Sequence, residues 1–175
     1  MKTNNIKERI REYFFVNPTT KLRVRQIERN VKVPLPSVIR YTKELEKEKI
    51  LKTTKIANIV TYSAQRTSKE LLMEKKLYNI KSLFSLTNFL IEELSNPVII
   101  VFGSYSKGED IEKSDIDIYI ETPEKKETVV KKFEKSLNRS IQIFMYKSID
   151  KIENKDLANN IINGIVLNGY LEVLK

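Results

Sequence analysis

The sequence feature that most constrains the fold is an apolar run that ends in a glycine turn. Val98–Phe102 are five consecutive apolar residues, Gly103 and Ser104 follow directly, and Gly108 comes four residues after Ser104. Residues 114–121 then read Ser-Asp-Ile-Asp-Ile-Tyr-Ile-Glu, with alternating character. The run predicts a buried strand and the alternation a half-buried one, so we expect strand, glycine turn, short helical loop and second strand.

Two carboxylates in the second strand are the first candidates for chemistry. Because side chains alternate across a strand, Asp115 and Asp117 share a face, with Cβ atoms roughly 6.5–7 Å apart. Such a pair can share a hard cation such as magnesium. Gly103 permits a backbone conformation or a close approach that a Cβ would block. The amides that follow it, with the Ser104 hydroxyl and the Lys107 charge, can meet a phosphate.

These residues carry a family resemblance. Gly103-Ser104, Gly108 and Asp115-x-Asp117, set between two strands, resemble the G-S-x-x-x-G…S-D-x-D signature of the DNA polymerase beta nucleotidyltransferase superfamily, especially its minimal nucleotidyltransferases. The resemblance implies transfer of a nucleoside monophosphate from an NTP with Mg²⁺ or Mn²⁺, and makes the two aspartates catalytic metal ligands. The nucleotide-binding residues that it implies are Gly103, Ser104, Lys107, Gly108 and Ser114. The simpler alternative is two exposed strand aspartates after an ordinary turn.

One position departs from the family pattern. The third carboxylate of the family lies on a later strand, and in the matching run, residues 140–146, Gln142 stands where an aspartate or glutamate is expected. A glutamine oxygen can ligate a cation but brings no negative charge and cannot act as a base. Glu121 is no obvious substitute, because it lies four residues past Asp117, roughly 13 Å along the strand.

The departure leaves three functions open. The domain transfers NMP to an unknown acceptor, or it is a catalytically inactive nucleotide sensor or scaffold within a transcription regulator. The third alternative is an antitoxin-like protein that adenylylates a protein partner, as relatives of this kind do.

Composition limits the remaining chemistry. The chain of 175 residues can hold one ordinary domain or two small ones. It contains no cysteine and no histidine, which excludes disulfides, thiolate metal sites and histidine-based acid–base catalysis. No apolar stretch approaches the ~20 residues that a membrane helix needs, and no secretory h-region is visible, so we expect a cytoplasmic protein without membrane contact.

The positive charge is concentrated in the first third of the chain. Residues 1–66 hold 16 Lys or Arg and 6 Asp or Glu, a net charge of +10, while the remainder carries −1. Such asymmetry indicates one module that meets a polyanion and another with a different task. A lysine-rich solubilising surface is the alternative.

The periodicity of this basic region predicts three helices and a hairpin. Helical spacing covers residues 5–15, a second short helix follows Leu22, and a third spans residues 37–49, with Val38, Thr42 and Leu45 facing inward. Residues 51–54 and 59–63 alternate like strands around a turn at 57–58. This order resembles the winged helix-turn-helix domain of transcription regulators, over residues 4–64.

The resemblance implies DNA binding through the third helix. Ser37, Arg40, Tyr41 and Glu44 share one face by helical spacing, with Arg40 as the first candidate for a base contact. The expected DNA-binding residues are Ser37, Arg40, Tyr41, Lys43, Lys47 and Lys55, with Arg25, Arg29 and Lys52 as further phosphate contacts. Winged helices also serve as protein-docking and dimerisation modules.

The predicted fold class is α+β with three parts. A winged helix-turn-helix domain occupies residues 1–66, a connecting helix 67–96, and a nucleotidyltransferase-fold α/β domain with a small mixed sheet 97–175. The connecting region reads as one long helix or two abutting ones. Its apolar stripe packs in the core or pairs two chains in a homodimer, and it consists of Met73, Leu77, Ile80, Phe84, Ile91 and Leu94, widened by Leu71, Leu83, Phe89 and Leu90. Beyond the site we expect a helix from Pro123 to Leu137, the Gln142 strand, and a helical segment over residues 157–174 interrupted at two glycines.

Overall fold

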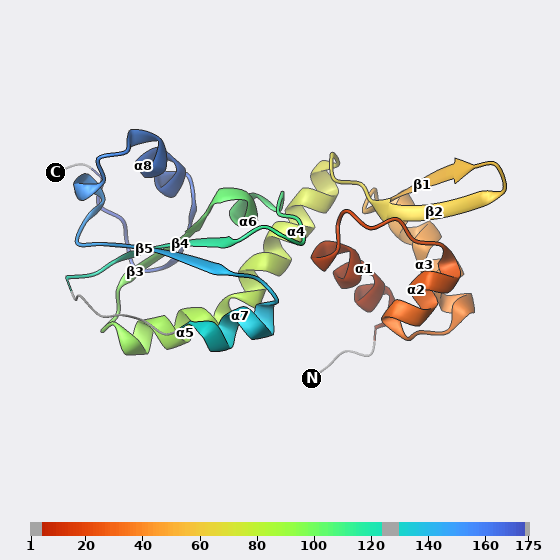
Figure 1. Ribbon diagram of the computed structural model, residues 1–175, viewed down its shortest axis with the longest axis horizontal. Coiled ribbons are helices and arrows are strands. Elements are labelled where there is room, and N and C mark those ends of the chain that lie inside the picture. The colour runs from red at the N-terminus through yellow and green to blue at the C-terminus, as the bar shows by residue number, and fades with distance from the viewer. Residues whose placement is uncertain (1–4, 124–129, 174–175) are drawn as a thin grey trace. The chain divides into compact units, whose positions relative to one another are not determined.

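The chain divides into two units, which we describe separately. A computed structural model describes residues 5–123 and 130–173 and divides the chain into Met1–Tyr78 and Asn79–Lys175 (Figure 1). The boundary falls inside helix α4 (Lys69–Ser82). Within the described ranges, none of the helices has the length and apolar character needed to span a membrane.

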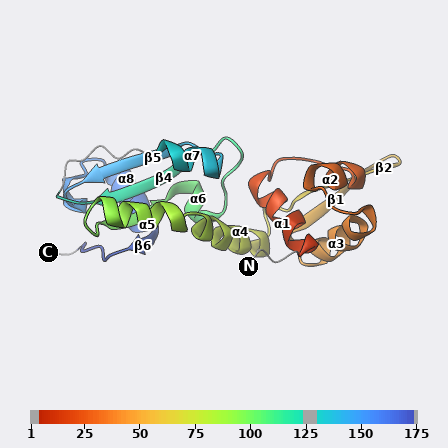
Figure 2. The same cartoon turned by 90° about the horizontal axis from the view of Figure 1, so that it is seen from below.

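The described part of the N-terminal unit consists of three helices, a hairpin and the first part of α4 (Figure 2). The helices are α1 (Ile6–Val16), α2 (Val24–Val31) and α3 (Leu35–Lys47). Strands β1 (Leu51–Ile56) and β2 (Ile59–Ala64) pair antiparallel. Helix α3 begins two residues earlier than predicted, because proline, including Pro36, is tolerated in the first helical turn, where amide donors have no helical partner.

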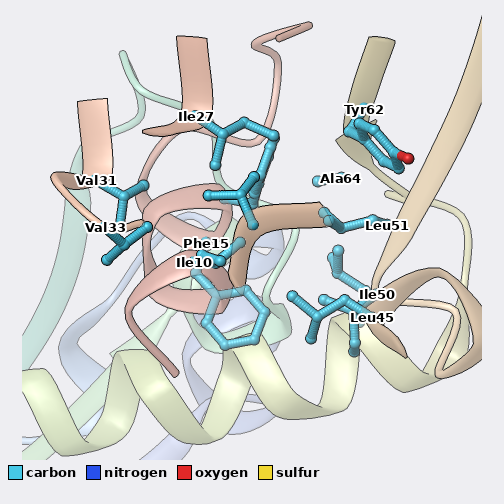
Figure 3. Packing of buried hydrophobic residues seen from close by; sticks show 13 residues of the cluster. Ile10, Phe15, Ile27, Val31, Val33, Leu45, Ile50, Leu51, Tyr62 and Ala64 are labelled. Carbon is cyan, nitrogen blue, oxygen red and sulfur yellow. The ribbon is translucent and has the colours of Figure 1, made fainter. Parts of the chain in front are cut away.

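Apolar side chains from all these elements form the core of the N-terminal unit (Figure 3). The predicted inward stripe of α3 is confirmed, since Val38, Thr42 and Leu45 are all fully buried. Thr42 satisfies its hydroxyl by donating to the Val38 carbonyl at 2.8 Å. Ile10 and Phe14 of α1 belong to the same cluster. The core therefore holds α3 by one face and leaves the opposite face outward.

The C-terminal unit is built on a four-stranded mixed sheet in the order β5-β4-β3-β6. The strands are β3 (Val98–Phe102), β4 (Ile116–Glu121), β5 (Ile141–Tyr146) and β6 (Ile165–Asn168). Strand β3 runs antiparallel to β4 and β6, whereas β4 and β5 are parallel. The remaining elements are α5 (Phe84–Glu93), α6 (Gly103–Lys107), α7 (Lys131–Leu137), the 3₁₀ turn η1 (Ile149–Lys151) and α8 (Lys155–Ile162).

The two faces of the sheet have separate apolar clusters. Ile116, Ile118 and Ile120 pack on the face covered by α5 and α7, and Tyr119 on the face covered by α8 (Figure 1). The side chains alternate between the faces as predicted, but the prediction of a half-buried strand is wrong, because Tyr119 on the second face is fully buried as well. Asp117 has the parity of Tyr119, so it belongs to the α8 face, at the end where β4 begins.

The predicted stripe of the connecting region is wrong in part. Residues 67–96 form two helices, α4 and α5, separated at Leu83. Met73, Leu77 and Phe84 are 61%, 59% and 67% exposed, whereas Leu83 is fully buried. Leu71, Leu83, Leu90 and Leu94 of the predicted stripe are buried, and the other buried positions are Ser68, Lys75, Asn79, Leu86 and Thr87. Periodicity therefore found the buried side of α5 but not that of α4, because the buried polar side chains of α4 do not register as apolar.

Two expectations for the end of the chain have different outcomes. The predicted helix across residues 165–168 is wrong, because these residues form β6 against β3. Gly164 makes this pairing possible, since a Cβ there would collide with the Val101 carbonyl and with Ile100. Residues 124–129, in which most of the predicted N-terminal half of the helix from Pro123 falls, lie outside the described residues, and α7 matches its C-terminal half.

The core of the N-terminal unit predicts a large effect at Leu45. Leu45→Ala lowers the free energy of unfolding by about 2–5 kcal/mol, because it leaves a cavity among fully buried neighbours. The exposed Met73→Ala is the control and changes it by less than about 0.5 kcal/mol. Hydrogen exchange of the slowest amides in α1 and α3 measures both values. Equal values for the two variants would contradict the burial described here.

Candidate functional site

Three strand ends converge where β3 ends and β4 and β5 begin. Asp117 is paired in register with Phe102 on one side and with Gln142 on the other. Side chains of residues in register on paired strands lie on the same face. Helix α6 begins at Gly103, directly after β3. This end of the sheet therefore brings together the glycine turn, the aspartate pair and Gln142.

Gly103 is favoured by its backbone conformation and lies against the side chain of Asp117. Its φ is +69°, a left-handed conformation that side chains disfavour. A Cβ at this position would also collide with Oδ2 of Asp117. The glycine thus lets the turn pass directly over the carboxylate, so a group bound by the turn would lie close to Asp117.

The two aspartates differ in environment. Asp115 is exposed directly before β4, and Asp117 is half-buried within it. Burial, and then the negative charge of Asp115, raise the pKa of Asp117 above its ordinary value. Two such carboxylates are a donor set that Mg²⁺ or Mn²⁺ accepts. The residues present therefore fit a divalent cation, although no cluster of three Asp, Glu, His or Cys occurs in the described ranges.

Gln142 occupies the strand position beside Asp117. It is exposed, and its register partner is Asp117 itself. The amide oxygen can complete a cation's oxygen shell, but the side chain adds no charge and accepts no proton at neutral pH. Asp115, Asp117 and Gln142 therefore lie at the same end of the sheet, but only the two aspartates can carry negative charge.

The other predicted nucleotide-binding residues lie in α6 and the loop after it. Ser104 is half-buried and Lys107 is exposed in the last turn. Gly108 ends α6 in a left-handed conformation, with φ +74°. The hydroxyl of Ser114 accepts a hydrogen bond from the Ile111 amide at 3.0 Å, so it shapes the turn that delivers Asp115.

A buried polar cluster behind α6 was missed in the sequence. Asn79 donates to the Tyr105 carbonyl at 2.9 Å and to Oδ1 of Asp110 at 2.8 Å. Arg139 lies at 3.9 Å from Asp110, and all three charged or amide side chains are buried. These bonds tie α6 and the loop after it to α4. Asp110 stands among other charged residues in the sequence, so nothing there distinguishes it from a surface acid.

A pocket opens beside Asp115. It has a volume of about 330 Å³ and is lined by Glu112, Lys113, Ser114, Asp115, Glu134, Asn138, Arg139 and Ser140. Glu134 also accepts a hydrogen bond from the Ile141 amide at 3.0 Å, which ties α7 to the start of β5. The lining is entirely polar or charged, so the pocket suits a hydrophilic group.

The predicted DNA-binding residues of the N-terminal unit divide by exposure. Arg40, Lys43 and Lys47 are exposed on α3, and Lys55 is exposed on β1. Ser37 is half-buried. The other candidates that lie exposed are Arg25, Arg29 and Lys52. The outward face of α3 therefore carries three of the six predicted residues.

Tyr41 and Glu44 are turned further inward than Arg40. Tyr41 packs against the core of the N-terminal unit, and Glu44 is half-buried. Helical spacing placed both residues with Arg40 on one face of α3. That predicted face is wider than the exposed surface of the helix, so its edge is partly buried. The missed member of the exposed face is Ile39, which is 42% exposed.

Comparison with known families adds a domain assignment. Residues 85–165 match the family model described as a nucleotidyltransferase domain. The match supports a nucleotidyltransferase domain over these residues. It runs from α5 to the start of β6 and includes the glycine turn, both aspartates and Gln142. No curated protein matches the chain.

The approach of Gly103 to Asp117 can be tested by a double-mutant cycle. Gly103→Ala lowers the free energy of unfolding by the roughly 1–2 kcal/mol of the left-handed penalty plus the smaller cost of turning the Asp117 carboxylate away from the new methyl. In an Asp117→Ala background, the cost of Gly103→Ala falls to the left-handed penalty alone. Urea denaturation of the four chains measures the coupling. Identical costs in both backgrounds would contradict the contact.

The raised pKa of Asp117 predicts a pH-dependent stability. The Asp117 carboxyl holds its proton more tightly in the folded state than in the unfolded chain. The free energy of unfolding therefore falls as pH rises from the ordinary carboxyl pKa through the raised pKa of Asp117. In metal-free buffer, Asp117→Asn is therefore more stable than the native chain at pH 7, and the difference disappears below about pH 3.

Urea midpoints at the two pH values check this prediction. Glu153→Gln is the control, because it makes the same acid-to-amide change at an exposed position. A native chain that is as stable as Asp117→Asn at pH 7 would show that the carboxylate is not destabilised by its surroundings.

Proposed function

We propose that the C-terminal unit binds an NTP with a divalent cation at the β3–β4 end of the sheet and transfers its NMP to an acceptor hydroxyl. The observation that carries the proposal is the turn at Gly103, which passes against Asp117 with Asp115 close by. Nucleotidyltransferases generally use divalent metal ions, and the two carboxylates are suited to hold one.

Each residue has a role that its position supports. Asp115 and Asp117 hold the cation, which when bound would neutralise charge on the phosphates. The first amides of α6 and the Ser104 hydroxyl hold the triphosphate, and exposed Lys107 adds charge beside it. The acceptor oxygen attacks the α-phosphorus and pyrophosphate leaves. Because Gln142 cannot take the acceptor's proton, solvent or the acceptor's own groups take it.

The same geometry supports a second candidate function. Gln142 is in register with Asp117, so the position that would carry a third carboxylate is filled by a neutral amide. A site with this charge can retain NTP and cation while transferring NMP slowly or not at all. In that case the C-terminal unit is a nucleotide sensor that acts on the N-terminal unit's function.

For the N-terminal unit we infer DNA binding by a winged helix-turn-helix. Its order of three helices followed by an antiparallel hairpin supports this proposal. The exposed Arg40, Lys43 and Lys47 on α3 and the net charge of +10 over residues 1–66 supply the attraction to phosphate. Such binding weakens steeply as salt concentration rises.

If the nucleotide site is at Asp115 and Asp117, NTP binding can be removed without loss of DNA binding. Asp115→Asn with Asp117→Asn abolishes metal-dependent NTP binding, because it removes both charged ligands, and leaves salt-sensitive DNA binding intact. Calorimetric titration of each NTP in the presence of Mg²⁺ or Mn²⁺ measures nucleotide binding. Titration of a DNA duplex at several salt concentrations measures DNA binding. Unchanged nucleotide affinity in the double variant would show that the site lies elsewhere.

Gln142→Asp distinguishes the enzyme from the sensor. Release of pyrophosphate by the native chain identifies an enzyme despite the glutamine. Binding without release, with release gained in Gln142→Asp, identifies a sensor. Gln65→Asp is the control, since it makes the same change in residues 1–78, outside the site.

A further inference from the structure

The outward face of α3 contains an apolar side chain among cations. Ile39 is 42% exposed, whereas Val38 and Leu45 of the same helix are fully buried. Lys43, about one turn further along, and Arg40, the next residue in the chain, are exposed on the same outward side of α3, and Ile39 lies at the edge of the arc that they form. An apolar side chain there cannot bind a phosphate, but it can contact an apolar atom of a base in a DNA groove.

Arg40 is held in place rather than left free in solvent. Its Nε donates to Oε1 of Glu44 at 2.9 Å, and its guanidinium lies 5.3 Å from the centre of the Tyr41 ring. Nζ of Lys7 on α1 lies 3.2 Å from the second oxygen of Glu44. The carboxylate is therefore fixed from α1 and fixes Arg40 in turn. Since the bond uses Nε, the two terminal nitrogens face a ligand approaching the end of the side chain, which is 71% exposed.

These two side chains match the chemistry of particular base edges. In the major groove, guanine presents O6 and N7 as paired acceptors, and thymine presents a methyl group. The terminal nitrogens of Arg40 can donate to such a pair, and the side chain of Ile39 can pack on such a methyl. Adjacent residues of a helix point about 100° apart, so they meet different base pairs.

We propose that α3 reads a guanine through Arg40 and a thymine of a neighbouring base pair through Ile39, with Glu44 as the residue that positions Arg40. The proposal rests on the proposed DNA binding of the N-terminal unit. It assigns a specificity role to Ile39 and Glu44, neither of which contributes positive charge.

The experiment uses the full chain and DNA selected from a random duplex pool. Each guanine of the selected site is replaced in turn by 7-deazaguanine, which lacks N7, and each thymine by deoxyuridine, which lacks the methyl. One deoxyuridine weakens native binding about fourfold, the value of one buried methyl group. One 7-deazaguanine weakens it about tenfold or more, the value of one hydrogen bond from a charged donor.

The variants connect each lost atom to a side chain. Ile39→Ala makes thymine and deoxyuridine equal at its position while leaving the guanine effect unchanged. Arg40→Ala removes the guanine effect and leaves the thymine effect. Glu44→Ala reduces the guanine effect, whereas Glu46→Ala, which removes the same charge from an exposed position of α3, leaves it unchanged.

Three results would overturn the proposal, and they differ from failure of DNA binding itself. A selected site made only of A·T pairs, which lacks guanine, or only of G·C pairs, which lacks thymine, contradicts the proposal. So do base-analogue effects that persist in Ile39→Ala and Arg40→Ala. Equal effects of Glu44→Ala and Glu46→Ala also contradict it. In all of these the native chain still binds DNA. A native chain with no salt-sensitive binding to any duplex instead removes the proposed DNA-binding function, and the base readout with it.

Discussion

The close approach of Gly103 to Asp117 is the constraint on which the candidate site depends. It exists because β3 and β4 pair in a register that sets Asp117 beside Phe102, the last residue before the turn. The left-handed φ of Gly103 then returns the chain over the carboxylate. Asn79 of α4 donates hydrogen bonds to the Tyr105 carbonyl and to Asp110, and so ties α6 and the loop after it to α4. A phosphate-sized anion and a cation would meet at the point that these contacts define.

The two units carry charge of opposite sign at their candidate sites. In the C-terminal unit, negative charge gathers at Asp115 and Asp117, and burial raises the pKa of the second, which leaves a carboxylate that a cation would stabilise. Gln142 beside it reduces repulsion at the cost of a base. In the N-terminal unit the excess is positive, and Glu44 organises part of it by binding Arg40 and Lys7. Neither arrangement needs a histidine or a cysteine, which this chain lacks.

Much of the fold could be predicted from short-range patterns, and the parts that could not were set by contacts distant in sequence. The β3 run, the hairpin and the inward stripe of α3 follow from periodicity and turn residues alone. Strand β6 was missed because its β-structure comes from pairing with β3, some 65 residues earlier. In the site, the glycine turn, the aspartate pair and the position of Gln142 were visible from the residues and the family pattern, whereas the buried Asp110 required the folded chain.

Paramagnetic broadening by Mn²⁺ tests most directly whether this end of the sheet is the nucleotide site. The measurement is an amide NMR spectrum of the full chain with a non-hydrolysable NTP and substoichiometric Mn²⁺. We expect broadening to be strongest at Gly103, Ser104, Asp117 and Gln142 and clearly weaker at Gly169, at the opposite end of β3. Broadening that is strongest elsewhere, or that is uniform over the chain, would show that the nucleotide does not bind at this end of the sheet.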